Sequence, residues 1–143
     1  VAHACARTGD KVLSVHAVHA VDDVLDVLER ASALGAMVGN ACIIHWFSGT
    51  SDQLTRARRA GCYFSVNPRM LQSKRGRAYA QAIPADRLLL ETDEPASAGA
   101  SWSAIRVRKL LEETLAQLVA LRDDDPAELR DRIAQTSRTL LQQ

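Results

Sequence analysis

The sequence has almost no net charge to direct it toward a polyanion. Its 18 Lys and Arg residues nearly balance 17 Asp and Glu residues, which leaves a formal net charge of +1. A strong overall field toward nucleic acid or a membrane surface is therefore excluded, although a few local arginines are enough to hold a phosphate backbone. Basic residues do cluster in the middle third, where solvated helix faces are the simpler explanation: Arg56, Arg58, Arg59, Arg69, Lys74, Arg75 and Arg77.

Cysteine is also scarce, and its spacing argues against a disulfide framework. Cys5, Cys42 and Cys62 are odd in number and show no CxxC pair. They predict free thiols in a reducing compartment, so we expect a cytoplasmic protein. No stretch approaches the roughly 18 apolar residues of a membrane span, and no signal peptide is visible, so we expect no membrane partner. The chain starts at Val1 within a helical pattern, so we expect it to be a segment of a longer protein.

What the sequence does contain is an alternation of short apolar runs and helical patterns. With 47% hydrophobic and 24% charged residues, its composition is that of a globular domain, and 143 residues suit one domain rather than two. The order β-α-β-α-β-α-β-α-α predicts an α/β fold with parallel strands and right-handed crossovers. The predicted strands are Val12–Val15, Ala41–Ile44, Tyr63–Val66 and Leu88–Leu90.

Polar side chains that can accept hydrogen bonds from a first helical turn mark the predicted helix starts. A first helix is expected to end near Gly9. Between the third and fourth strands we expect a loop followed by a short helix, within Met70–Ala82. The other predicted starts are Asp22 or Asp23 after the first strand, Thr50 with Gln53 as a capping box, Ser103 before a long helix, and Asp125 with Pro126 before the last helix.

Three of the predicted strands are followed by a side chain that can bind a metal. His16 and His45 end two strands, and Asp93 follows the fourth. Because parallel strands lie about 4.8 Å apart and end at one edge, these side chains are expected to converge. Sets of His, His and carboxylate suit zinc, manganese and similar ions, which acidify a water and offset charge on a phosphoryl or carbonyl oxygen. A single histidine after an apolar run is more often a core residue, but three such ends favour a site.

Several neighbours leave alternatives open. Glu91 and Glu94 flank the aspartate and compete with it as ligands. Strand alternation sends Glu91 to the same side as Asp93, so the alternative for Glu91 is to support a ligand instead of binding the metal. His19 is interpreted as a surface residue or as support for a ligand. Trp46 and Phe47, next to the second strand end, could stack a nucleic-acid base or could pack into the core.

These residues fall in blocks that resemble a known family. Val15–Ala17, Ile44–Gly49 and Leu90–Pro95 are similar to the last three metal-binding blocks of the TatD family of metal-dependent deoxyribonucleases, in order and with similar spacing. The resemblance runs from about Leu13 to Leu141. Two stretches most resemble the TatD-like nucleases of Qat anti-phage defence systems. They are Ile-His-Trp-Phe-Ser-Gly at 44–49 and Gly-Cys-Tyr-Phe-Ser-Val-Asn-Pro at 61–68.

The resemblance implies a fold and a set of ligands. The family fold is a TIM-type (β/α)₈ barrel, so residues 1–143 would be a single partial domain, the carboxy-terminal half with family strands 5–8. His16 and His45 would bind one divalent metal ion. Asp93 would bind a second ion and orient or deprotonate the attacking water. The two ions would be zinc, magnesium or manganese, and the family's remaining ligands, an amino-terminal His-x-His and a glutamate, would precede Val1.

The implied function is metal-dependent hydrolysis of DNA phosphodiester bonds, in anti-phage defence with partner proteins of such a system. The isolated segment is expected to be inactive. Two alternatives are a non-catalytic member that binds nucleic acid or a partner, and a related hydrolase of amide or lactone bonds. Val18 stands where the family often has arginine, and Ser137 where asparagine is common. These departures concern substrate contacts and leave the implied metal ligands intact.

Overall fold

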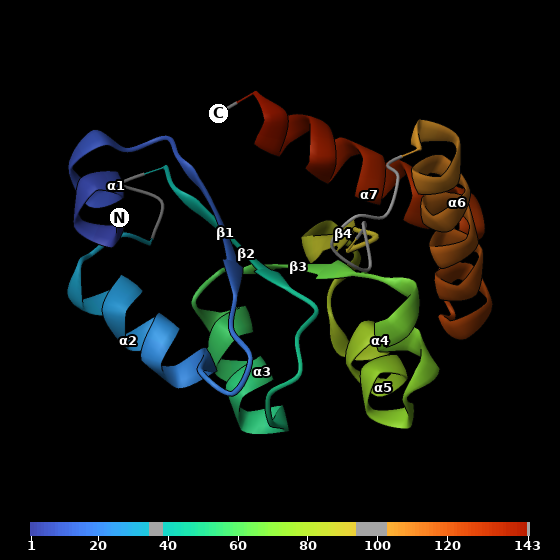
Figure 1. Ribbon diagram of the computed structural model, residues 1–143, viewed down its shortest axis with the longest axis horizontal. Helices are drawn as coiled ribbons and strands as arrows, with labels where there is room; N and C mark the ends of the chain where they lie inside the picture. Colours follow the sequence, from blue (N-terminus) through green and yellow to red (C-terminus); the bar gives the residue numbers. More distant parts are fainter. Residues whose placement is uncertain (35–38, 94–102, 143) are drawn as a thin grey trace.

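In a computed structural model of the chain, residues 1–34, 39–93 and 103–142 are described, and they build one parallel sheet with helices around it (Figure 1). Its order is β1-β2-β3-β4, and every neighbouring pair is parallel. β1 and β4 are open edges of this part of the chain, as expected of four strands, which are too few to close an eight-stranded barrel. All four predicted strands are confirmed: β1 (Val12–His16), β2 (Ala41–His45), β3 (Tyr63–Val66) and β4 (Leu88–Leu90).

Helices connect the strands and follow them. Helices α2 to α5 lie along one side of the sheet, and α6 stands beyond its β4 edge (Figure 1). The capping box of Thr50 and Gln53 is confirmed, as are the predicted starts at Ser103 and Asp125. The bounds are α1 (Ala2–Thr8), α2 (Val21–Arg30), α3 (Ser51–Arg59), α4 (Pro68–Gln72), α5 (Lys74–Ala82), a 3₁₀ turn η1 (Ala85–Arg87), α6 (Ala104–Leu121) and α7 (Pro126–Leu141).

One predicted helix start and one predicted loop were wrong. α2 begins at Val21, and no side chain caps it, so neither Asp22 nor Asp23 is its cap. The short helix predicted within Met70–Ala82 is confirmed as α5, but the loop before it is wrong, because α4 spans Pro68–Gln72 and α5 follows directly. The physical reason is Asn67, whose side-chain oxygen accepts from the Met70 N–H at 2.8 Å and so caps α4. Pro68 then occupies the first helical position, where proline is favoured.

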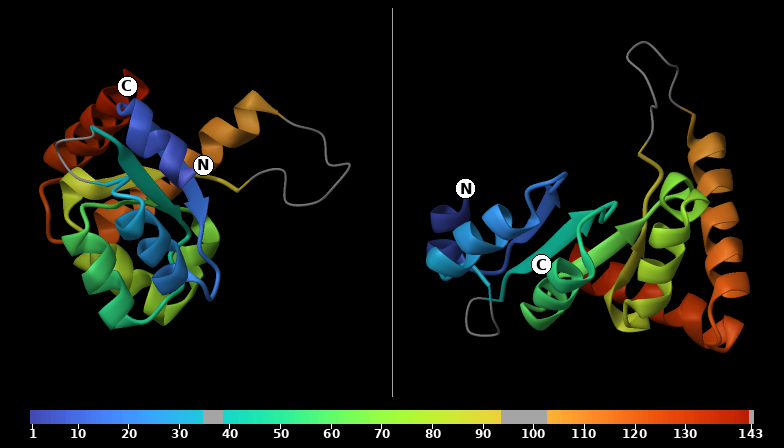
Figure 2. Two further views of the ribbon diagram at one scale, coloured as in Figure 1. Left: turned by 90° about the vertical axis from the view of Figure 1, so that its left-hand side faces the viewer. Right: turned by 90° about the horizontal axis from the view of Figure 1, so that it is seen from below.

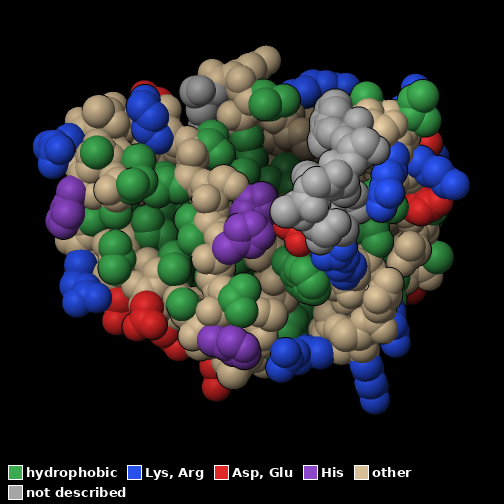
Figure 3. All heavy atoms as spheres, in the orientation of Figure 1, with side chains coloured by type: hydrophobic (Ala, Val, Ile, Leu, Met, Phe, Trp, Pro, Cys, Tyr) green, Lys and Arg blue, Asp and Glu red, His purple; other side chains and the backbone are tan. Residues whose placement is uncertain are grey.

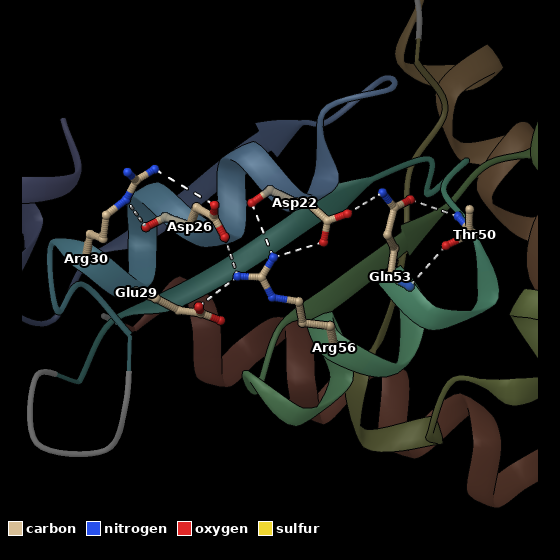
Figure 4. A network of polar contacts seen from close by, with 7 residues as sticks. All are labelled: Asp22, Asp26, Glu29, Arg30, Thr50, Gln53 and Arg56. Atoms are coloured by element: carbon tan, nitrogen blue, oxygen red, sulfur yellow. Dashed lines mark hydrogen bonds and ion pairs between the residues drawn. The ribbon is translucent and has the colours of Figure 1, made fainter.

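Asp22 instead joins α2 to α3 through Arg56 (Figure 4). The Arg56 guanidinium donates to Asp22 at 2.9 Å, to Asp26 at 2.6 Å and to Glu29 at 2.8 Å. Gln53 donates to the second oxygen of Asp22 at 2.7 Å. Hydrogen bonds from Gln53 and Arg56 hold the pKa of the Asp22 carboxyl below its ordinary value. This exposed network therefore favours the ionised carboxylate, and it ties two neighbouring helices together.

The sheet twists from β1 to β4 (Figure 2). Its two faces carry different side chains. The face toward the helices is apolar, with Leu13, Ile44, Phe64 and Leu88 buried in the main core. The opposite face, called here the histidine face, carries Ser14, His16, His45 and Ser65 where the strands end, by the alternation of side chains along each strand. Near the strand starts it is apolar, and Leu140 of α7 packs there against Ala41 and Leu89.

The three cysteines are free thiols, as predicted. Cys42 on β2 and Cys62, which directly precedes β3, are both buried. A hydrogen bond with Cys42 and burial together raise the pKa of the Cys62 thiol. Within residues 1–34, 39–93 and 103–142, no helix is both long and apolar enough to cross a membrane.

Candidate active site

His16 and His45 lie side by side at the carboxyl edge of the sheet. The β1–β2 register pairs them directly, and their ring centroids are 4.9 Å apart with a 30° tilt. Histidine side chains accordingly gather near the middle of the face shown in Figure 3, with apolar side chains to one side of them. The convergence expected from two strand ends is thus observed for the two imidazoles.

The His45 ring is oriented by a carboxylate. Its Nδ1 contacts an oxygen of Glu91, and the Ser65 hydroxyl lies 2.9 Å from Nδ1 and donates to the same Glu91 oxygen at 2.5 Å. An ionised carboxylate only accepts hydrogen bonds, so Nδ1 carries the proton and donates it to Glu91. Nε2 then carries no proton, and its electron pair accepts a hydrogen bond from the Ser14 hydroxyl. This is how a carboxylate prepares a histidine to bind a metal.

Glu91 is in turn fixed by a buried amide. Asn67, which is fully buried, donates from Nδ2 to the second Glu91 oxygen at 2.9 Å. The same side chain caps α4 through its oxygen. Helix α4, Asn67, Glu91 and His45 therefore form one connected chain of contacts, which determines where the imidazole points.

Asp93 lies apart from this chain of contacts. β4 ends at Leu90, and Asp93 has a left-handed backbone with φ of 56°, so strand alternation no longer sets its direction. Its carboxylate is exposed and faces the Arg69 guanidinium at 3.9 Å. Across the described ranges no cluster of three His, Cys, Asp or Glu side chains is placed to hold a metal ion. The role of His16, His45 and Asp93 as metal ligands stays a prediction. The rival ligand Glu94 lies outside the described residues.

Sequence reasoning missed three supporting side chains. Ser14, Ser65 and Asn67 were assigned no role in the site. The signal was present in the strand period, because Ser14 and His16 share a face, as do Ser65 and Asn67. The register then places Ser65 opposite His45. What could not be known without the structure was which strand neighbours which.

Among the described residues, three of the five non-glycine residues with positive φ lie in loops that follow strands. His19, Trp46 and Asp93 all have positive φ, at 55°, 41° and 56°. A bulky residue such as tryptophan is rarely found in this conformation, and outliers of this kind concentrate at functional sites. The loops after β1, β2 and β4 each contain one.

Comparison with known proteins identifies the family. The model of the TatD related DNase family matches residues 2–142. The chain belongs to this family. A 3'-5' ssDNA/RNA exonuclease TatD from Erwinia tasmaniensis is 31% identical over 114 residues, which are 70% of this chain and 42% of that protein. A protein of the same name from Musicola paradisiaca is 41% identical over 58 residues, 38% of this chain and 22% of that protein.

A solved structure of another protein has the same fold as this TatD-family chain. The crystal structure of the TatD homologue YJJV from Escherichia coli matches with a TM-score of 0.70 at 21% identity. The match covers 90% of this chain and 49% of that one. The chain thus spans about half the length of that structure and less than half of the Erwinia relative.

Proposed function

We propose that the chain is the carboxy-terminal half of a metal-dependent hydrolase that cleaves phosphodiester bonds in DNA, trimming from an end. In this proposal the chain supplies strands 5–8 of a TIM-type barrel, and the complete polypeptide is called here the full-length protein. Membership of the TatD related DNase family supports nuclease chemistry. One structural observation carries the proposal: two adjacent imidazoles at the carboxyl edge of a parallel sheet, one of them oriented by a carboxylate.

The donor chemistry fits part of a metal site. His16 forms no hydrogen bond with another residue in the described ranges, so its ring nitrogens are available. The Nε2 of His45 accepts from the Ser14 hydroxyl, which would have to turn away for a metal to bind there. Two imidazoles suit zinc or manganese. They are fewer than a complete ligand set, so we propose that residues of the full-length protein outside this chain supply the rest. Two divalent ions, zinc, magnesium or manganese, are proposed for the complete site.

Within this site each residue has a distinct task. A bound metal would lower the pKa of a water and offset the charge that develops on the phosphoryl oxygens. His16 and His45 would hold the ion, and Glu91 would keep the His45 proton on Nδ1. Asp93 would bind the second ion and orient or deprotonate the attacking water. The Arg69 guanidinium lies 3.9 Å from the Asp93 carboxylate and forms an ion pair with it.

The wider setting is also proposed. The sequences of Ile44–Gly49 and of residues 61–68 resemble those of Qat anti-phage nucleases. We therefore propose a role in cytoplasmic anti-phage defence, together with partner proteins of such a system. The free thiols agree with a reducing compartment.

The test is a gel assay of the full-length protein with end-labelled DNA, with added manganese, magnesium or zinc and with a chelator. We expect stepwise shortening that the chelator abolishes. His45→Ala should remove the activity, whereas His3→Ala, an exposed histidine on α1, should leave it intact. Cleavage that persists in the chelator, or at the wild-type rate in His45→Ala, would overturn the proposal.

A further inference from the structure

A hollow lies at the amino edge of the sheet, where the strands begin, opposite to the edge that carries the histidines. Its volume is about 530 Å³, within the roughly 300–1,000 Å³ of small-molecule sites. It lies between the end of α3 and the turn η1, which leads directly into β4, so it is separate from the candidate active site. We call it the arginine hollow, and its lining consists of Thr55, Arg58, Arg59, Pro84, Asp86 and Arg87.

The arginine hollow has an excess of positive charge. Three of its lining side chains are arginines and one is an aspartate. Arg58 and Arg59 are exposed, and neither side chain forms a hydrogen bond or ion pair with another residue in the described ranges. In the same ranges Asp86 forms no ion pair with any of the three arginines. Like charges that share a hollow repel one another, and an anion bound between them would relieve that repulsion.

Arg87 is held in place before any ligand binds. Its guanidinium lies over the Tyr63 ring, 4.6 Å from the ring centroid. Its Nη1 donates to the Gly61 carbonyl at 3.3 Å. A guanidinium has five N–H donors, so those that do not point to Gly61 remain for an anion. A side chain fixed in this way loses less conformational entropy when it binds a ligand.

The dipole of α3 explains only part of this charge. Arg58 and Arg59 lie in the last turn of α3, where the carbonyl end of a helix favours cations. Arg87 comes from η1, a different segment, so the end of α3 does not account for it. Arg56 of the same last turn shows the contrast, because three carboxylates pair with it. The chain therefore compensates its structural arginine and leaves the three in the hollow to an external anion.

We propose that the arginine hollow binds the phosphate chain of a small polyphosphorylated molecule, which can be an inorganic polyphosphate or a nucleoside triphosphate. Guanidinium groups match phosphate oxygens in pairs, and three of them suit linked phosphates better than one isolated anion. Among the described residues the lining has no aromatic side chain, and Arg87 covers the nearby Tyr63 ring. The hollow should therefore recognise the phosphates and not a nucleobase. This inference does not depend on the proposed function.

Calorimetric titration of the full-length protein in EDTA tests the proposal. EDTA removes divalent ions from the histidine site, so phosphate cannot bind there through a metal. The probes are tripolyphosphate, ATP, GTP and sulfate. The first three should bind with affinities that agree within about threefold, because they share the phosphate chain. Sulfate should bind about tenfold or more weakly, because it offers a single anionic group.

Arg58→Ala and Arg59→Ala should each weaken tripolyphosphate binding by about tenfold, the effect of losing a hydrogen bond to a charged group. Arg59→Lys should recover only part of the affinity, because lysine keeps the charge and loses the planar fork. Arg130→Ala is the charge-matched control, since Arg130 is exposed on α7 and absent from the lining, and it should bind as wild type does. Thermal unfolding of each variant shows whether it is folded.

Unchanged affinity in folded Arg58→Ala and Arg59→Ala would overturn the proposal. ATP bound about tenfold more tightly than tripolyphosphate would also overturn it, because the base would then be recognised. A hexaglutamate peptide or a DNA oligonucleotide is a further probe. If either binds as tightly as tripolyphosphate and loses this binding in Arg59→Ala, the hollow is not a site for small phosphate chains.

The gel assay keeps this result separate from the proposed function. The arginine variants should hydrolyse DNA at the wild-type rate, whereas His45→Ala should lose hydrolysis and still bind tripolyphosphate. Loss of tripolyphosphate binding in folded His45→Ala would place the ligand at the histidines and overturn the proposal. Tripolyphosphate binding through the arginines in a protein without DNA hydrolysis would retain the arginine hollow and reject the nuclease.

Discussion

Asn67 offers the sharpest test of what positions His45, because this one buried side chain both caps α4 and hydrogen-bonds Glu91. Its oxygen caps α4 through the Met70 N–H at 2.8 Å, and its amide donates to the Glu91 carboxylate at 2.9 Å. Loss of a helix cap costs about 0.5–2 kcal/mol. Loss of a hydrogen bond to a charged group costs about 1.5–3 kcal/mol. Asn67→Ala in the full-length protein should therefore lower the free energy of unfolding by about 2–5 kcal/mol.

Two further variants separate the two jobs. Asn67→Ser keeps a good capping oxygen but cannot reach Glu91, so only the second cost, about 1.5–3 kcal/mol, should remain. Asn67→Asp also keeps the cap but sets a carboxylate against Glu91, so its destabilisation should be largest at neutral pH and should shrink in acid.

Urea denaturation followed by far-ultraviolet circular dichroism measures these differences. All three variants should also bind metal more weakly, by about 10–100-fold, because Glu91 would no longer orient His45. A loss of less than about 1 kcal/mol in Asn67→Ala, or metal affinity unchanged in all three variants, would refute the reasoning.

Three other predictions follow from the same contacts. Asp93→Asn should nearly abolish hydrolysis by the full-length protein while its circular dichroism spectrum stays unchanged, and wild-type turnover would refute the role of Asp93. The pKa of Asp22 is lowered in the folded state, so its stabilising contribution is complete above about pH 4 and is lost as the pH falls through the lowered pKa. Asp22→Asn should thus lower the unfolding temperature at pH 7, and the difference from wild type should shrink toward pH 2; a constant difference would contradict this. Residues 1–143 alone should self-associate in size-exclusion chromatography and lack DNA hydrolysis with manganese, magnesium or zinc, because half of the proposed barrel is missing; a monomer with near full-length activity would show that four strands suffice.

The sheet could be predicted from sequence because its signals are local. Leu88–Leu90 and Ala41–Ile44 are short apolar runs, each bounded by turn residues, and the intervening helical patterns require parallel pairing. Thr50 and Asp125 likewise act on backbone within three residues. The prediction of Asp22 as a helix cap was wrong because its contacts are not local. It has the chemistry of a cap, but its carboxylate is used by Gln53 and Arg56, about 30 residues further along the chain.

Only part of the site could be predicted, because some of its contacts join residues that are distant in the sequence. Strand ends and alternation indicated His16 and His45, and the register confirmed that they are neighbours. The link from Asn67 through Glu91 to His45 spans three strand ends, and its geometry depends on packing that no local pattern records. Asp93 shows the limit of alternation, since the strand stops at Leu90 and the backbone then turns into the left-handed region.

The central claim is that His16 and His45 share one metal ion. Anomalous diffraction from crystals of the full-length protein grown with manganese or zinc tests it directly. The account predicts a peak at bonding distance from an imidazole nitrogen of both residues, with Nε2 as the ligand atom of His45 because Nδ1 is engaged by Glu91. An ion bound elsewhere in the protein, with no peak beside these two rings, would contradict it.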